Sequence, residues 1–220
     1  MTSVKLVAIT KPAIDELESC GQLLAYCARV SNPSNQLNHG TAEKLLKYMV
    51  DNDHWSPFEM VSATIEVITT RDIGRQLLRH WSFRFQEFSQ RYAEVTAPLV
   101  VREARLQDIT NRQNSIYIDD SITLQRDWIN IQQLLIDYAN SSYKWAIDSG
   151  IAKECARVVL PEGMTESRMY IAGNLRSWIH YIRLRSGNGT QKEHREIAEK
   201  CRLILTNEIP ELEEILWHKK

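Results

Sequence analysis

The sequence has few cysteines, and their spacing does not suggest a metal site or a disulfide framework. The four cysteines, at positions 20, 27, 155 and 201, are far apart, and no two form a Cys-x-x-Cys pair. This argues against a zinc ribbon and against a disulfide-rich scaffold. The six histidines show no metal-ligand spacing. We therefore predict no metal, and we interpret Cys20, Cys27 and Cys201 as small core residues.

Glycine-rich nucleotide motifs and long hydrophobic runs are also missing. The sequence contains no G-x-G-x-x-G and no P-loop motif, so a standard dinucleotide or triphosphate site is not predicted. It contains no G-x-S-x-G elbow, so Ser89 is not in a hydrolase context. No apolar run reaches membrane-spanning length, and the N-terminus lacks a signal-peptide profile. We expect a cytoplasmic protein that does not associate with membranes.

Lysine is absent between Lys47 and Lys144, although this stretch contains nine arginines. Arginine binds phosphate and carboxylate bidentately and stacks on flat rings, which lysine does not. The net charge of −1 does not favour a nucleic-acid-binding module, so we predict no nucleic-acid partner. The block from 71 to 91 is a candidate anion site. We interpret the other arginines as solvated residues on helix surfaces: Arg102, Arg105, Arg112 and Arg126.

The 220 residues, 43% of them hydrophobic, can bury one core, and we predict a single domain over 1–220. Strands are predicted over 3–10, 61–69 and about 167–172, because apolar and polar residues alternate there or β-formers cluster. Helices are predicted over 12–29, 41–53, 69–80, 121–150, 152–161, 174–185 and 190–207, with capping boxes at 56–59, 69–72 and 190–193. Residues 31–40 and 93–120 are expected to be irregular. The fold class is α+β, a mixed α/β domain with long helices packed on a small, mainly antiparallel sheet.

The segment RHWSFRFQEFSQRY, residues 79–92, combines aromatic and charged side chains. Phe83, Phe85 and Phe88 need burial, whereas the arginines and Glu87 need partners, because burying an unpaired charge is costly. Either these polar groups pair with each other or a polar ligand completes them. Aromatic rings beside arginine suit a flat charged ligand, such as a nucleotide or a dinucleotide cofactor.

Three further clusters are weaker signals. Arg157 is one charge in the apolar stretch ECARVVLP and could pair with Glu154. Arg183 and Arg185 end a predicted helix, where they could simply complement its dipole. The helix start in HWSPFE, 54–59, could receive an anion or be an ordinary cap.

These motifs together resemble the signature of the flavin-dependent thymidylate synthases, the ThyX family. The family pattern R-H-R, seven residues, S is matched by Arg79, His80 and Ser89, with Glu87, Arg91 and Tyr92 in its extended form. Other blocks occur in family order: A-R-V-S at 28–31, His54 to Glu59, R-Q at 75–76, A-R-x-V-L-P at 156–161, N-x-R-S at 174–177 and L-R at 184–185. The resemblance covers about residues 20–200.

The resemblance implies FAD as a cofactor, NADPH as reductant, methylenetetrahydrofolate as carbon donor, and methylation of dUMP to dTMP in a homotetramer with active sites between subunits. It implies two catalytic residues: Arg185 would stabilise negative charge on the pyrimidine, and Ser89 would polarise the uracil by a hydrogen bond. It implies contacts with dUMP by Gln76, Arg79, Ser89, Gln90, Arg91, Arg157 and Arg185. It implies contacts with FAD by Ser31, His54, Ser56, Glu59, Arg79, His80, Trp81, Ser82, Glu87, Asn174 and His180.

The sequence departs from the family pattern at the third signature residue, where Trp81 replaces arginine. We predict that Arg84 supplies the missing charge from the neighbouring turn. Two alternatives stay open: a relative that transfers another one-carbon group, such as hydroxymethyl, to a pyrimidine nucleotide, and a non-catalytic homologue that binds flavin or nucleotide. The conventional thymidylate synthase needs a cysteine nucleophile in a Pro-Cys-His setting, which no cysteine here has.

Overall fold

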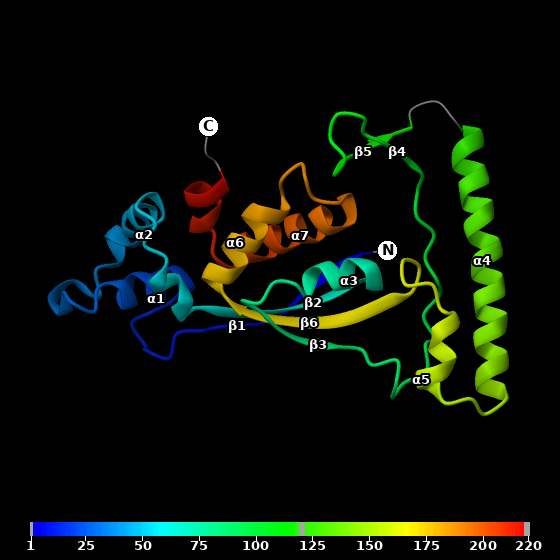
Figure 1. The fold of residues 1–220 in the computed structure, drawn as a ribbon. Helices are drawn as coiled ribbons and strands as arrows, with labels where there is room; N and C mark the ends of the chain where they lie inside the picture. Colours follow the sequence, from blue (N-terminus) through cyan, green and yellow to red (C-terminus); the bar gives the residue numbers. More distant parts are fainter. Residues whose placement is uncertain (1, 119–121, 218–220) are drawn as a thin grey trace.

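The computed structural model describes residues 2–118 and 122–217 and contains a central antiparallel sheet (Figure 1). Its four strands follow the order β1–β2–β6–β3. All three neighbouring pairs are antiparallel, which confirms the α+β class and the small antiparallel sheet. The bounds are β1 (Ser3–Ile9), β2 (Ser62–Thr70), β3 (Arg84–Glu87) and β6 (Glu166–Asn174).

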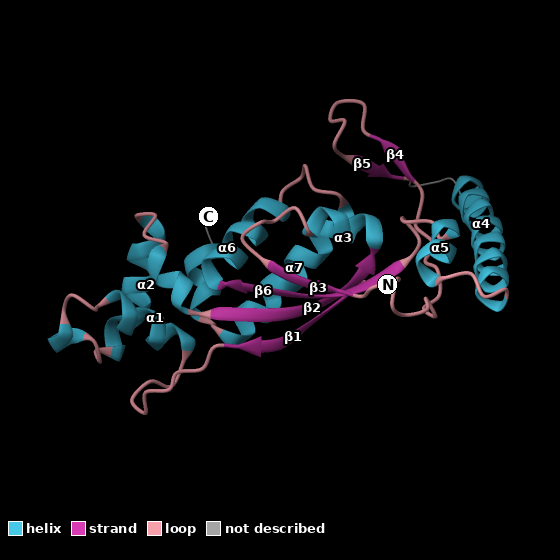
Figure 2. Ribbon diagram, turned by 60° about the horizontal axis from the view of Figure 1, so that its bottom comes forward, coloured by secondary structure: helices cyan, strands magenta, loops and turns pink. Residues whose placement is uncertain are grey.

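One face of this sheet carries three helices, α3 (Arg71–Leu77), α6 (Leu175–Arg185) and α7 (Lys192–Glu208) (Figures 1 and 2). The predicted alternation in β2 is confirmed, because Ala63, Ile65 and Val67 are buried while Thr64 and Glu66 are not. Trp178 of α6 is fully buried against this face, and its indole Nε1 donates to the Ala63 carbonyl at 3.2 Å.

The remaining helices lie at the two ends of the sheet (Figure 1). Helices α1 (Cys20–Ala28) and α2 (Ala42–Asp51) lie at one end, with a 3-10 turn at Ser56–Met60. At the other end stand the long helix α4 (Ile122–Asp148) and the short α5 (Lys153–Ala156). A turn of π-helix, Glu213–Trp217, follows α7. None of the helices in the described residues is long and apolar enough to span a membrane.

Several helix starts differ from the prediction. Helix α1 begins at Cys20 rather than near residue 12, because Ser19 caps it by accepting from the Gln22 backbone N–H. The three predicted capping boxes are wrong: the N-cap residues are Trp55, Thr70 and Gln191, and none makes a side-chain cap bond. The start predicted at residue 121 lies outside the described residues. Gly150, which follows α4, has the left-handed conformation common at helix C-termini, with φ of 78°.

Residues 93–120 contain more structure than predicted. Strands β4 (Arg105–Gln107) and β5 (Ser115–Tyr117) form a short antiparallel hairpin. The prediction of solvated Arg102 and Arg105 is also wrong. Arg102 pairs with Asp72 at 2.8 Å, and Arg105 pairs with Glu193 at 2.7 Å, both partly buried. Each arginine is thus neutralised by a carboxylate far away in sequence, 30 residues for Asp72 and 88 residues for Glu193. The spacing of residues along one helix cannot predict such pairs.

Gly173 of β6 has no side chain, and the ring of Phe83 occupies the space that a side chain would fill. A Cβ at residue 173 would overlap the Phe83 ring, and this ring packs 4.4 Å from the Trp178 ring. We expect Gly173→Ala to lower the free energy of unfolding by about 1–3 kcal/mol through overpacking, measured by urea denaturation. Gly187→Ala is the control, because its added Cβ would meet only the Leu184 carbonyl at 3.7 Å. Equal stability of both variants would contradict the packing argument.

Candidate functional site

The segment 79–92 runs from the end of α3 along the edge strand β3, and its aromatic residues are not equally buried. Phe83 is buried against Trp178, and Phe85 is partly buried, as predicted. Phe88 is 38% exposed, so its predicted burial is wrong. The segment is therefore anchored at its start, and in its second half Phe88, Arg91 and Tyr92 are exposed while Gln90 is buried.

A first group of polar residues lies where α3, α6 and α7 meet. The Arg185 guanidinium Nε donates to His80 Nε2 at 3.0 Å. Gln76 lies one helical turn before His80, and its Oε1 is 3.1 Å from His194 Nδ1. Its Nε2 donates to Gln191 Oε1 at 2.8 Å. The structure thus brings together three predicted site residues, Gln76, His80 and Arg185.

The two imidazoles of this group are held neutral. Burial lowers the pKa of His80 to about 4, and the positive charges of Arg185 and Arg79 add to the shift. Burial likewise lowers the pKa of His194 to about 3, with Arg185 and His80 contributing. The buried Tyr181 ring lies 4.9 Å from His80, and burial raises the pKa of its hydroxyl. Near pH 7 the cation of the group is therefore Arg185.

These pKa shifts predict that the protein is less stable in acid. Both folded pKa values lie below the ordinary value of 6.5, so the unfolded chain binds more protons as pH falls below 6.5. Stability is fully present above pH 6.5 and is lost as pH falls towards 4, by at most about 1.4 kcal/mol per pH unit for each histidine. Urea denaturation between pH 8 and pH 5 measures this loss. His194→Gln should flatten the slope below pH 6.5; an unchanged slope would contradict the assignment.

A second group lines a cavity of about 500 Å³ between α3 and the segment that follows α5. Its walls include Arg71, Arg75, Gln90 and Arg157. The possible pairing of Arg157 with the Glu154 carboxylate is not found: Arg157 Nε donates to the Glu154 backbone carbonyl at 3.3 Å. The Glu154 carboxylate instead accepts from Arg91 Nε at 3.2 Å. Arg157 therefore has no carboxylate partner among the described residues.

Gln90 adds an unused donor to this cavity. The residue is 5% exposed, and its buried Nε2 has no hydrogen-bond partner among the described residues. A buried amide donor without a partner is costly, which favours a ligand at this position. Ser89 lies beside it, and its Oγ accepts from the Arg91 backbone N–H at 3.4 Å. The predicted residues Ser89, Gln90, Arg91 and Arg157 thus lie in one region.

Glu87 pairs with Arg71, which lines this cavity, but its carboxylate is occupied by protein contacts. Its Oε1 accepts from Ser167 Oγ at 2.8 Å and pairs with Arg71 at 3.3 Å. Arg75 is held by Glu162 at 2.7 Å. Of the arginines in this cavity wall, Arg71 and Arg75 are therefore neutralised and Arg157 is not.

A third group surrounds the start of α6 and the turn at Ser56–Met60. The Trp55 ring lies 4.8 Å from the His180 ring, and the Arg183 guanidinium lies 5.0 Å from the centre of Trp55. Glu59 forms an ion pair with Arg176. The side chain of Asn174 accepts from the Ser177 N–H and so caps α6. His54, Ser56 and His180 are exposed.

Four other predicted cofactor residues are at the surface. Ser31, Arg79 and Ser82 are exposed, and Trp81 is 89% exposed. Arg84 Nη1 donates to the backbone carbonyls of Trp81 at 3.2 Å and Phe83 at 2.9 Å. The charge of Arg84 thus lies beside Trp81. That Arg84 replaces the missing arginine stays a prediction.

The sequence interpretation missed several residues of these groups. Arg75 stands in the R-Q pair at 75–76, so that motif could have indicated it. Arg71, Tyr181, Gln191 and His194 carry no local signal, because their partners are distant in sequence: 115 residues separate Gln191 from Gln76. The described residues contain no cluster of three or more His, Cys, Asp or Glu side chains that could hold a metal.

Comparisons with known proteins agree with the motifs. The family model "Thymidylate synthase complementing protein" matches residues 14–211. A probable flavin-dependent thymidylate synthase of Paramecium bursaria Chlorella virus 1 is 46% identical over 217 residues, 97% of this chain and 98% of the relative. The flavin-dependent thymidylate synthase of Synechocystis sp. is 46% identical over 94% of this chain and 95% of its own.

The fold is similar to that of a solved enzyme. The crystal structure of the UMP/dUMP methylase PolB from Streptomyces cacaoi, bound with 5-Br dUMP, superposes with a TM-score of 0.83 at 28% identity, covering 98% of this chain and 94% of that chain. Sequence motifs, family model and fold agree over nearly the whole length. The chain therefore belongs to the family of thymidylate synthase complementing proteins, the flavin-dependent thymidylate synthases.

Proposed function

We propose that the protein methylates dUMP to dTMP, with methylenetetrahydrofolate as carbon donor and NADPH as reductant. The observation that carries the proposal is the cavity of the second group, called the second cavity below, where, among the described residues, Arg157 has no carboxylate partner and the buried Gln90 Nε2 has no acceptor. A cation and an amide donor together suit a phosphate or a uracil carbonyl. A relative of the same fold was solved with 5-Br dUMP, which supports a pyrimidine nucleotide as the substrate class.

The other predicted substrate residues complete a binding arrangement for dUMP. Arg157 and Arg91 would hold the phosphate, and Ser89 would donate a hydrogen bond to the uracil. Arg185 would lie against a pyrimidine carbonyl, where its charge stabilises negative charge that develops on the ring. His80 is neutral and accepts from Arg185, so it orients the guanidinium without competing for the substrate's charge. Gln76 and Arg79 complete the set.

The third group presents the kinds of side chain that FAD needs. A diphosphate and a flat ring need cations, hydroxyl or imidazole donors and aromatic surface. The group offers the exposed His54, His180 and Ser56, and Arg183 stacked on Trp55. We propose that these residues, with Ser31, Glu59, Arg79, His80, Trp81, Ser82, Glu87 and Asn174, hold the cofactor. FAD, when bound, takes electrons from NADPH and supplies the hydride that completes the methyl group.

We propose that the protein is a homotetramer with its active sites between subunits. Two observations support this. The predicted FAD residues and the second cavity lie in separate groups on one chain, so a second chain is needed to bring them together. Helix α4 also exposes large apolar side chains, and Leu134 is 71% exposed and Tyr138 76% exposed. Such a row is unusual on the surface of a monomer and suits an interface with another copy.

The tetramer proposal is tested by Leu134→Glu. A charge placed in a buried apolar interface opposes association, so we expect smaller assemblies in light scattering and loss of bound flavin. Lys144→Glu, on the same helix with a 78% exposed side chain, is the control. A tetrameric Leu134→Glu protein would show that α4 does not form the interface.

The activity is tested with the purified protein. Absorbance should show bound flavin, and NADPH oxidation should require both dUMP and methylenetetrahydrofolate. Mass spectrometry of the nucleotide identifies the product. A protein without flavin and without dUMP-dependent oxidation would refute the proposal, and a product heavier than dTMP by one oxygen would show hydroxymethyl transfer instead.

A further inference from the structure

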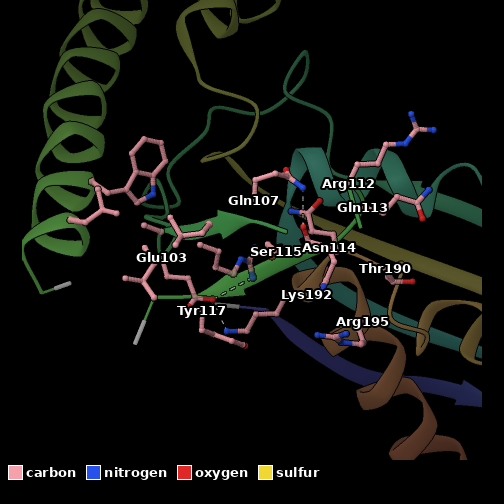
Figure 3. Close-up of a pocket in the computed structure, with 17 residues that line it drawn as sticks. Glu103, Gln107, Arg112, Gln113, Asn114, Ser115, Tyr117, Thr190, Lys192 and Arg195 are labelled. Atoms are coloured by element: carbon pink, nitrogen blue, oxygen red, sulfur yellow. Dashed lines mark hydrogen bonds and ion pairs between the residues drawn. The ribbon is translucent and has the colours of Figure 1, made fainter. Parts of the chain in front are cut away.

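A cavity separate from the three groups lies beneath the β4–β5 hairpin (Figure 3). Its volume is about 560 Å³. The hairpin forms one wall, and the first turns of α4 and α7 form the others. None of the residues predicted to bind dUMP or FAD lines it.

The cavity carries an excess of positive charge. Its lining has four basic side chains, Arg105, Arg112, Lys192 and Arg195, and one acidic side chain, Glu103. Glu103 accepts from Lys192 at 2.6 Å and from Arg105 at 3.3 Å. Among the described residues, the guanidinium groups of Arg112 and Arg195 form no ion pair and no hydrogen bond, although the charge of Arg195 lowers the pKa of Glu199 on the same helix. Arg112 and Arg195 can therefore attract an anionic ligand to the cavity.

The same cavity has aromatic walls. Tyr117 and Trp128 line it, and both are exposed. Lys192 Nζ lies 4.9 Å from the centre of the Tyr117 ring, so a cation and a flat surface stand side by side. A flat ring could stack here while its charged substituent meets an arginine. The lining thus suits an anion that carries an aromatic ring better than a bare inorganic ion.

One residue joins this cavity to the first group of the candidate site. Gln191 lines the cavity, and its Oε1 accepts from Gln76 Nε2 at 2.8 Å. Gln76 in turn contacts His194 beside His80 and Arg185. A ligand long enough to pass Gln191 would therefore have one end in the cavity and the other at the predicted dUMP site.

We propose that the cavity binds the anionic tail of a co-substrate whose reacting end lies at the first group of the candidate site, where His80 is proposed to contact FAD and Arg185 to contact dUMP. This rests on the proposed function. The shared chemistry is an aromatic ring followed by phosphate or carboxylate groups. It is present both in the phosphorylated adenosine of NADPH and in the p-aminobenzoyl-glutamyl tail of methylenetetrahydrofolate.

Steady-state kinetics of Arg195→Gln and Arg112→Gln separate the two sources. Loss of one charge-assisted contact should raise the KM of the affected co-substrate about tenfold and leave kcat unchanged. An effect with NADPH but not with NADH, which lacks the 2′-phosphate, assigns the cavity to the phosphate. An effect with triglutamyl but not with monoglutamyl folate assigns it to the carboxylates. Lys144→Gln, on an exposed lysine at the far end of α4, is the control for lost charge.

Binding can also be measured without turnover. Adenosine 2′,5′-bisphosphate and triglutamyl folate are the probes, and tryptophan fluorescence is the readout, because Trp128 lines the cavity. One probe should change the emission of the unaltered protein, and Trp128→Phe should remove this change. Arg195→Gln should weaken the binding of that probe about tenfold.

The two proposals fail in different ways. Absence of dUMP-dependent NADPH oxidation in the unaltered protein would overturn the proposed function, and the fluorescence assay would still decide the cavity. Unchanged KM values in both variants, together with no Trp128-dependent emission change, would overturn the cavity proposal while leaving the proposed function intact.

Discussion

Arg185→Ala is expected to lose roughly 100- to 1,000-fold in kcat/KM with dUMP and to keep its flavin. The reason is that Arg185 is the cation held by His80 at 3.0 Å, placed for charge that develops on the pyrimidine. Losing one such preorganised donor typically costs this much. Flavin should stay bound, because the contacts of Trp55 with His180 and Arg183 do not involve Arg185. Stopped-flow or steady-state assays and the absorbance of the purified variant measure the two effects.

Two further variants make this result interpretable. Arg185→Lys keeps the charge but loses the Nε–H that meets His80, so intermediate activity is expected. Lys47→Ala removes a 61% exposed cation on α2 and should change nothing. Full activity in Arg185→Ala would show that the predicted role of this residue is wrong.

Arg157→Ala is expected to raise the KM for dUMP about 100-fold, with a smaller effect on kcat. Arg157 is the arginine of the second cavity whose charge no carboxylate meets, so a phosphate would be its partner. The effect should depend on that phosphate. The unaltered protein should prefer dUMP to deoxyuridine strongly, and the variant should lose most of this preference.

The matched control is Arg168→Ala. Arg168 has a 59% exposed side chain on β6, with Glu66 3.8 Å away, and it does not line the cavity. Its loss should leave the KM unchanged. If Arg157→Ala keeps its preference for dUMP over deoxyuridine, the phosphate is bound elsewhere.

The helices and strands that could be predicted from the sequence are those with a regular pattern of apolar residues. Strand β2 alternates because one of its faces is buried, and α4 and α6 are strongly patterned, so their existence followed directly. Helix starts were less predictable, because a Ser-x-x-Glu pattern does not require the side chain to cap. At residues 56–59, Glu59 pairs with Arg176 instead.

The candidate site was predictable only where a motif names its residues. Arg79, Ser89 and Arg185 stand in family motifs, but Tyr181 and His194 are brought to His80 by packing of α6 and α7. Arg102 and Arg105 show the same limit, since the carboxylates that neutralise them lie 30 and 88 residues away. Contacts of this range depend on the tertiary fold, which no spacing rule encodes.

The donor and acceptor roles along the hydrogen bonds through Gln76 are fixed by one partly buried carboxylate, that of Glu193. Glu193 is ionised, and its pKa is lowered by hydrogen bonds from its own N–H and from Gln191 and by the charges of Arg105 and Arg102, against the opposing effect of burial. It can only accept, so Gln191 Nε2 must donate to it at 2.9 Å, which leaves Gln191 Oε1 to accept from Gln76. Gln76 Oε1 then requires a proton on His194 Nδ1. A negative charge three hydrogen bonds away thus selects the tautomer of a buried imidazole, and turning over one of the two amides would force the other to reverse with it.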